Sequence, residues 1–112
     1  MGQTKHLVYE TANTAVLQCD RTELFHITLF SQELRLSACQ FIAFRKKIQD
    51  LDFEELFTDN HPGVEIVYLP FCDKLLVFSL KEVIELKDLF SGSFAMLELN
   101  SLINRKLQNS LL

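Results

Sequence analysis

Two stretches of this sequence share one pattern of apolar residues, and this repetition constrains the fold more than any other feature. They are LRLSACQFIAFRKKI, residues 34–48, and LVFSLKEVIELKDLF, residues 76–90. Each begins with apolar residues two positions apart, which is the periodicity of a β-strand. Each continues with apolar residues at spacings of three and four, which is the pattern of one helix face. The chain is therefore predicted to form the same strand-and-helix unit twice.

A serine marks the predicted start of the helix in both copies. Each serine is followed three residues later by a glutamine or glutamate, as the pairs Ser37–Gln40 and Ser79–Glu82. This spacing is a capping box, in which the two side chains bond each other's backbone N–H groups. Three apolar helix positions also align without a gap: Phe41, Phe44 and Ile48 in one copy, and Val83, Leu86 and Phe90 in the other.

A further apolar stretch precedes each copy across a short turn. These stretches are HITLF, residues 26–30, and EIVYL, residues 65–69. Each unit therefore reads as strand, tight turn, strand and helix, over about residues 24–57 and 64–91. HLVYET and TAVLQC, within residues 6–19, predict one more hairpin around Ala12 and Asn13.

The segment after residue 90 continues at roughly helical spacing. Gly92 makes it either a separate helix or a weakened point inside one long helix, and the long helix is favoured. Together the elements predict a single α+β domain over residues 1–112. It has an antiparallel sheet built from the N-terminal hairpin and two pseudo-repeated ββα units, with a C-terminal helix.

The composition limits the classes of partner. The chain is 48% hydrophobic with 10 Phe residues, and its net charge is −4. Such a chain can fold around one core, and its acidic balance argues against nucleic-acid binding. The three cysteines show no C-x-x-C spacing, which favours free thiols in a reducing compartment. No stretch has the length of a membrane span or the apolar region of a signal peptide, so a cytoplasmic protein without membrane contact is expected.

The residues that commonly perform chemistry are few and scattered. Glycines occur only at positions 2, 63 and 92, which excludes a Gly-rich phosphate loop, a Rossmann fingerprint and a nucleophile elbow. The histidines and cysteines lack the spacing of a metal site, so we expect no metal and no cofactor. The one candidate polar site is His26 with Arg35 opposite it on the neighbouring strand. No catalytic residue is identified, and the protein is not expected to be an enzyme.

The two units differ on the sheet face that is turned away from their helices. In the first unit this face is predicted to be polar, with His26, Thr28, Glu33 and Arg35. In the second unit it is predicted to be aliphatic, with Val67, Leu69, Leu75 and Val77. An uncovered patch of this kind is near the limit that monomers tolerate. Three covers are possible: the C-terminal helix through Leu97, Leu102 and Ile103, a second copy of the chain in a homodimer, or another protein.

The stretches VLQCDRTELFHITLFSQELRLSACQFIAF and SLKEVIELKDLFSGSFAMLEL resemble a family of small proteins from Bacteroidetes bacteria that is known as a domain of unknown function. The resemblance extends from about Thr14 to Leu99 and lies in the order of strand, capping box and helix. It implies a small bacterial protein and carries no activity over to this chain.

The sequence thus favours a non-enzymatic protein-interaction module that self-associates, or binds another protein, through an apolar sheet face. The alternative is a small-molecule-binding or enzymatic protein with a Phe-lined pocket between the two repeats.

Overall fold

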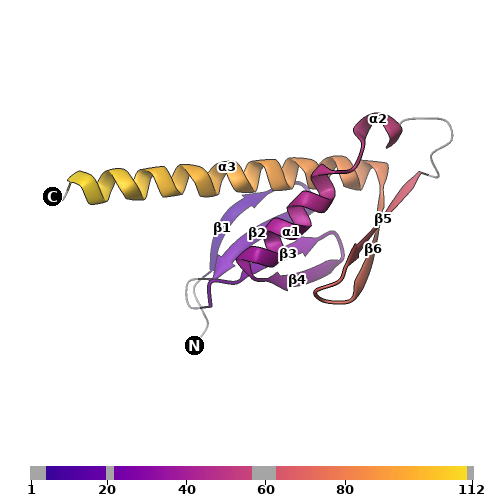
Figure 1. The fold of residues 1–112 in the computed structure, drawn as a ribbon, viewed down its shortest axis with the longest axis horizontal. Helices are drawn as coiled ribbons and strands as arrows, with labels where there is room; N and C mark the ends of the chain where they lie inside the picture. The colour runs from indigo at the N-terminus through magenta and orange to yellow at the C-terminus, as the bar shows by residue number, and fades with distance from the viewer. Residues whose placement is uncertain (1–4, 20–21, 57–62, 111–112) are drawn as a thin grey trace.

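The fold is an antiparallel four-stranded sheet covered on one face by two helices, with a separate two-stranded hairpin beside it (Figure 1). The computed structural model describes residues 5–19, 22–56 and 63–110. The elements in chain order are β1 (Lys5–Glu10), β2 (Thr14–Cys19), β3 (Phe25–Leu29), β4 (Gln32–Leu36), α1 (Ala38–Gln49), α2 (Phe53–Leu56), β5 (Val64–Leu69), β6 (Lys74–Ser79) and α3 (Leu80–Ser110).

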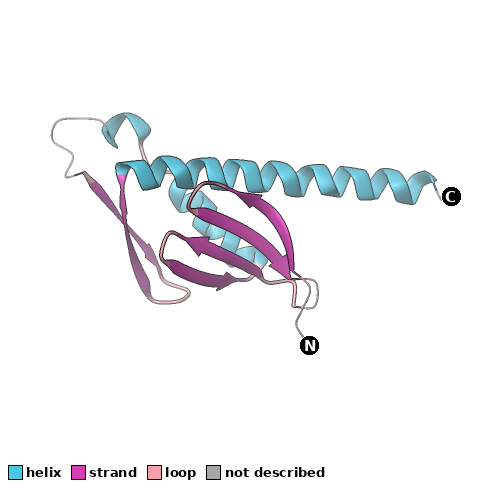
Figure 2. Cartoon of the chain, turned by 180° about the vertical axis from the view of Figure 1, so that it is seen from behind, coloured by secondary structure: helices cyan, strands magenta, loops and turns pink. Residues whose placement is uncertain are grey.

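The four-stranded sheet has the order β1-β2-β3-β4, so the predicted N-terminal hairpin joins the hairpin of the first unit. The helices α1 and α3 lie on the same side of this sheet, and Figure 2 shows its other face uncovered. The second unit pairs only β5 with β6 and forms a sheet of its own. The predicted α+β class is confirmed.

Both predicted capping boxes are present. The Ser37 N–H donates to Gln40 Oε1 at 2.9 Å, and the Gln40 N–H donates to Ser37 Oγ at 3.2 Å. The matching distances for Ser79 and Glu82 are 2.8 Å and 3.3 Å. All six aligned apolar positions of the two helices are buried as well. The two units therefore share the order of strand, turn, strand and capped helix, but their hairpins belong to two separate sheets rather than to the single sheet predicted.

Removing either cap is expected to cost about the same free energy. Ser37→Ala and Ser79→Ala should each lower the free energy of unfolding by about 1 kcal/mol, because each leaves one helix N–H without its acceptor. Urea denaturation followed by circular dichroism measures both changes. Ser91→Ala, an exposed position within α3, is the control and should show no loss. A loss at only one of the two caps would contradict the equivalence of the units.

The core is organised around the ring of Phe41, from α1. Its ring centroid lies 4.6 Å from that of Phe25 on β3. On α3, it lies 5.5 Å from Phe90 and 5.0 Å from Phe94. The outer side of Phe94 is covered by Arg45, whose guanidinium carbon lies 4.1 Å from the ring centre. These aromatic contacts join the sheet, α1 and α3 into one core.

The segment after residue 90 is part of one helix: α3 runs for 31 residues through Gly92, as favoured from the sequence. The glycine is needed there because the Tyr9 ring of β1 lies directly on the helix. A Cβ added at Gly92 would overlap the Tyr9 ring. The hydroxyl of Tyr9 also donates to Asp88 Oδ1 at 3.1 Å, and this bond and the charge of Asp88 raise the Tyr9 pKa.

Glu85 lies about one helical turn before Asp88 on the same face of α3, and it binds the β1–β2 turn. It accepts hydrogen bonds from the Thr11 hydroxyl, the Asn13 side chain and the Asn13 backbone N–H, the last at 2.7 Å. Desolvation alone would raise the Glu85 pKa, but these hydrogen bonds outweigh it and hold the pKa below its ordinary value. The β1–β2 hairpin is therefore fastened to α3.

Candidate functional site

The outer face of the β5–β6 hairpin is apolar and exposed. The register places Ile66 opposite Val77 and Tyr68 opposite Leu75. Ile66, Leu75 and Val77 are 63%, 67% and 57% exposed. Together with Val64 and Tyr68, which are also exposed, these residues are called the hairpin face below. The Tyr68 hydroxyl donates to Asp73 Oδ1 at 3.0 Å and thus ties its ring to the β5–β6 turn.

The register corrects the predicted face at two of its four positions. Leu75 and Val77 lie on the exposed face, as predicted, whereas Val67 and Leu69 are 4% and 0% exposed and belong to the core. Val67 lies opposite the buried Leu76, so both point inward. Successive side chains of a strand point to opposite faces, so an alignment shifted by one residue exchanges the two faces.

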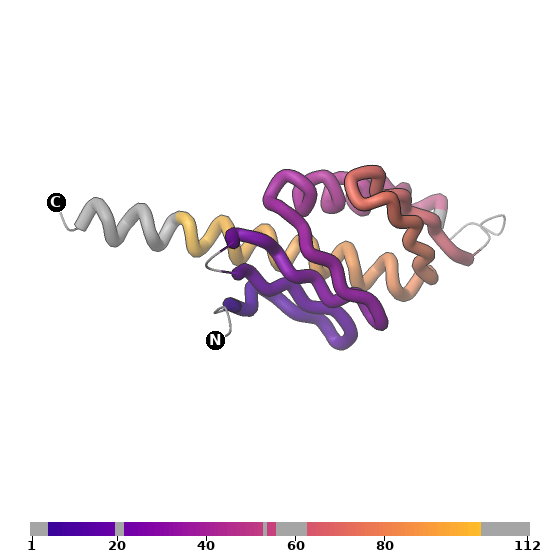
Figure 3. Tube along the Cα trace, turned by 90° about the horizontal axis from the view of Figure 1, so that it is seen from below, coloured from indigo at the N-terminus to yellow at the C-terminus, as the bar shows by residue number. Residues whose placement is uncertain are grey.

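The C-terminal part of α3 does not cover the hairpin face. Figures 1 and 3 show the β5–β6 hairpin beside the first turns of α3, and Figure 1 shows that the C-terminal turns lie at the other end of the molecule. Leu97, one of the three predicted covering residues, packs against the main core instead. The side chains of the other two, Leu102 and Ile103, lie outside the described part of the structure.

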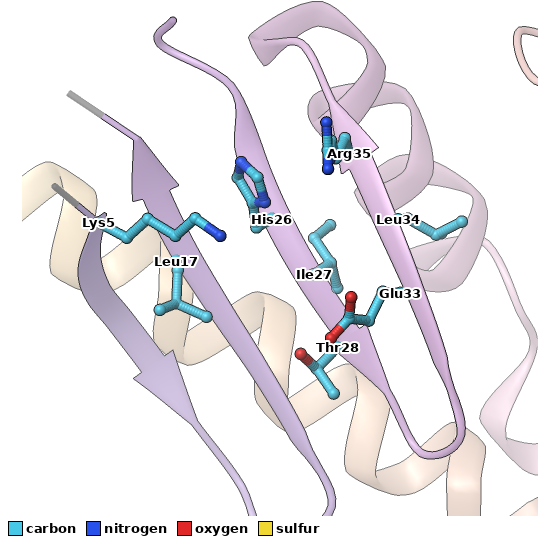
Figure 4. Close-up of a pocket in the computed structure, with 8 residues that line it drawn as sticks. All are labelled: Lys5, Leu17, His26, Ile27, Thr28, Glu33, Leu34 and Arg35. Atoms are coloured by element: carbon cyan, nitrogen blue, oxygen red, sulfur yellow. The ribbon is translucent and has the colours of Figure 1, made fainter. Parts of the chain in front are cut away.

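A second, polar site lies on the uncovered face of the four-stranded sheet (Figure 4). It is a hollow of about 330 Å³. His26 of β3 lies directly opposite Arg35 of β4, as predicted, and Thr28 lies opposite Glu33 in the next outward row. Lys5 enters from β1 and points toward His26 across β2. The hollow therefore brings two cationic groups, Lys5 from β1 and Arg35 from β4, toward the imidazole of His26 on β3.

These neighbours change the protonation of His26. Partial burial lowers the pKa of His26, and the positive charges of Lys5 and Arg35 lower it further. Glu33 acts in the opposite direction but is outweighed. The neutral imidazole, which has one nitrogen as a donor and one as an acceptor, is therefore favoured more strongly than in a free histidine. Sequence reasoning paired His26 with Arg35 but missed Lys5, because no local motif links β1 to β3.

The buried phenylalanines fill space between the two units by packing on one another. Besides the contacts of Phe41, the ring of Phe44 lies 5.0 Å from that of Phe90. The ring centroid of Phe30, in the β3–β4 turn, lies 6.2 Å from that of Phe78 on β6. In the described part of the chain, these rings are components of the core and its margin.

Two searches of the described residues bear on other classes of site. No three of their His, Cys, Asp and Glu side chains lie together in a way that could hold a metal ion. None of the helices in residues 5–19, 22–56 and 63–110 is both long and apolar enough to span a membrane. A scan against protein-family models and searches of curated proteins and of solved structures find no match to this chain.

Proposed function

We propose that this protein is a non-enzymatic interaction module that associates with a second copy of itself through the hairpin face. The observation that carries the proposal is the exposure of five apolar side chains on one side of a two-stranded sheet. A hairpin of two strands is marginally stable alone, and here only its inner side is packed on the core. A partner on the outer side would complete a layered packing.

The size of the hairpin face supports a second copy as the partner. Its exposed fractions correspond to about 500 Å² of accessible surface on one chain, and complete coverage of both faces would bury about 1,000 Å², the smallest area expected of a specific interface. The five side chains of the face are uncharged, and Asp73, which accepts the bond from the Tyr68 hydroxyl, lies in the turn at its end, so the aliphatic centre of the face can be covered without burying a charge. A two-fold axis near the Ile66–Val77 pair would place like residues together.

Face-to-face packing is favoured over pairing of strand edges. Edge pairing would extend the hairpin into a wider sheet and leave the apolar side chains in water. Packing of the two faces removes them from water, and two-layered β structures commonly associate in this way. The free thiols of Cys39 and Cys72 are exposed, which fits a reducing cytoplasm as the place of this association.

The test is the mass of the protein in solution as its concentration is raised to about 100 µM, a range that detects even weak dimers. Light scattering after gel filtration should give the mass of a dimer for the natural sequence. Val77→Glu should give a monomer, because pairing would then bury two like charges. Ile42→Glu, at an exposed apolar position of α1, is the control and should remain dimeric.

Mixing charges sharpens this test. A mixture of Val77→Glu and Val77→Lys chains should form a heterodimer although each chain alone is monomeric, because opposite charges then meet near the two-fold axis. A natural chain that remains monomeric at the highest concentration would overturn self-association. Equal effects of Val77→Glu and Ile42→Glu would show that the hairpin face is not the interface.

A further inference from the structure

We infer that the hollow on the uncovered face of the four-stranded sheet binds a small oxyanion, the carboxylate or phosphate group of a small molecule. This site is separate from the hairpin face and does not depend on the proposed self-association. The groups that carry the inference are Lys5, His26 and Arg35, which come from three different strands (Figure 4).

The sheet register fixes the positions of these groups. Arg35 and His26 face each other on neighbouring strands, and Leu17 on β2 lies opposite His26 on its other side. Leu17 therefore forms an apolar floor between Lys5 and His26. Paired strands hold their side chains at fixed spacing, so the basic groups converge without any loop having to close.

The charge in the hollow is unusual for this chain. The whole protein carries a net charge of −4. Among the residues that line the hollow, however, Lys5 and Arg35 are cations and Glu33 is the one carboxylate. Partial burial is the main cause of the lowered His26 pKa, and the positive charges of Lys5 and Arg35 lower it further, against the opposite effect of Glu33. Lys5 and Arg35 therefore repel a proton on the imidazole. A bound anion would relieve this repulsion.

The chemistry of the three groups matches an oxyanion better than a neutral ligand. A guanidinium presents parallel N–H donors that fit two oxygens of a carboxylate or phosphate, and an ammonium adds a third donor. The imidazole donates one bond when neutral and gains a positive charge when protonated. The volume of about 330 Å³ is at the small end of ligand sites, so the ligand is small.

Glu33 and Thr28 define the other end of the ligand. They lie opposite each other in the row next to His26 and Arg35, on the same face of the sheet. A carboxylate and a hydroxyl accept hydrogen bonds, so this end favours a hydroxyl or amino group on the ligand. The hollow is therefore suited to a small hydroxylated or aminated acid or phosphate ester.

Binding should be coupled to the protonation of His26. Because the bound anion stabilises the imidazolium, it should raise the His26 pKa, and by linkage the anion should bind more tightly as the pH falls through that pKa. This coupling distinguishes a site around His26 from general attraction of anions to the protein.

The experiment is an NMR titration of the His26 ring from pH 5 to 8 at constant ionic strength. It uses inorganic phosphate, acetate and chloride as separate probes. The expected result is a saturable response to phosphate or acetate, with a His26 pKa at least half a unit above its value in chloride. A response to phosphate alone indicates a phosphorylated ligand, and one to acetate alone or to both indicates a carboxylate-compatible site.

Two variants assign the response. Arg35→Gln should weaken anion binding by about tenfold, as expected for the loss of one charge-assisted pair of hydrogen bonds, and Lys5→Gln should weaken it several-fold. Lys74→Gln, which removes an exposed lysine of β6, should leave it unchanged. The inference is overturned if the His26 pKa is the same in all three salts, or if Arg35→Gln and Lys74→Gln have the same effect. Arg35 is itself exposed, so its replacement should leave the fold intact, which circular dichroism checks.

Discussion

Replacing Phe41 with alanine is expected to lower the free energy of unfolding by about 3–5 kcal/mol, the largest effect of any single change considered for this chain. The side chain is 1% exposed, and its ring lies within 5.5 Å, centroid to centroid, of Phe25, Phe90 and Phe94. Alanine would leave a cavity at the point where the sheet and both helices meet. Because the free energy of unfolding of a small domain is only about 5–15 kcal/mol, this change would remove a large part of it.

Urea denaturation, followed by circular dichroism in the far and near ultraviolet, measures this loss. Phe41→Leu, which keeps most of the volume, should cost less than half as much. Ile42→Ala is the matched control, since Ile42 is the next residue of α1 and is 52% exposed. Its change should stay within about 0.5 kcal/mol. A loss for Phe41→Ala no larger than for Ile42→Ala would contradict the role of Phe41 as the centre of the core.

The second large effect is expected at Gly92, where Gly92→Leu should destabilise the protein by about 2–3 kcal/mol. In an isolated helix the same change would be favourable by nearly 1 kcal/mol, because leucine is a better helix former than glycine. The loss arises because the new side chain occupies the position of the Tyr9 ring. The β1–β2 hairpin must then move away from α3, and the bond from Tyr9 to Asp88 is broken.

Making the same substitution in a Tyr9→Ala variant separates the steric overlap with the Tyr9 ring from the difference in helix propensity between glycine and leucine. In a Tyr9→Ala chain the space over Gly92 is free, so Gly92→Leu should there be neutral or stabilising by up to about 1 kcal/mol. Ser91→Leu, at the exposed neighbouring position, should change stability little in either background. If Gly92→Leu costs the same with and without the Tyr9 ring, the contact between them is not the reason for the glycine.

The parts of the fold that were predictable from the sequence are those specified by nearby residues. The two helix starts were predictable because a capping box involves residues three positions apart, and both boxes are present. The buried helix positions were predictable because apolar spacing defines one face. The row that joins His26 to Arg35 was also predictable, because a short turn connects their strands.

The hairpin face was only half predictable because it depends on the length of a turn. Two residues connect β3 to β4, whereas four connect β5 to β6. Aligning the two units by the ends of their apolar stretches ignores this difference, and places Val67 in the position of the outward Thr28. In the structure Val67 pairs with Leu76, and Ile27 pairs with Leu34. Because Leu76 and Leu34 are equivalent positions of the two units, Val67 corresponds to the inward Ile27. A shift of one residue was enough to exchange the faces.

Contacts between distant parts of the chain left no signal in the sequence. The need for Gly92 comes from Tyr9, and the full set of basic groups around His26 requires Lys5 from a strand that is not its neighbour. Such pairs depend on how α3 and β1 are placed by the whole fold. A single sequence contains no local pattern that reports them.

The fastening of β1 and its turn to α3 has a consequence for protein synthesis. The hydrogen bond between Tyr9 and Asp88 joins residues 79 positions apart in the sequence. The bond between Thr11 and Glu85 joins residues 74 positions apart. A ribosome makes the first hairpin long before it makes the helix that holds this hairpin. During synthesis, therefore, β1 and β2 are complete before the helix that covers their apolar side has been made, and their native packing can form only after α3 has left the exit tunnel.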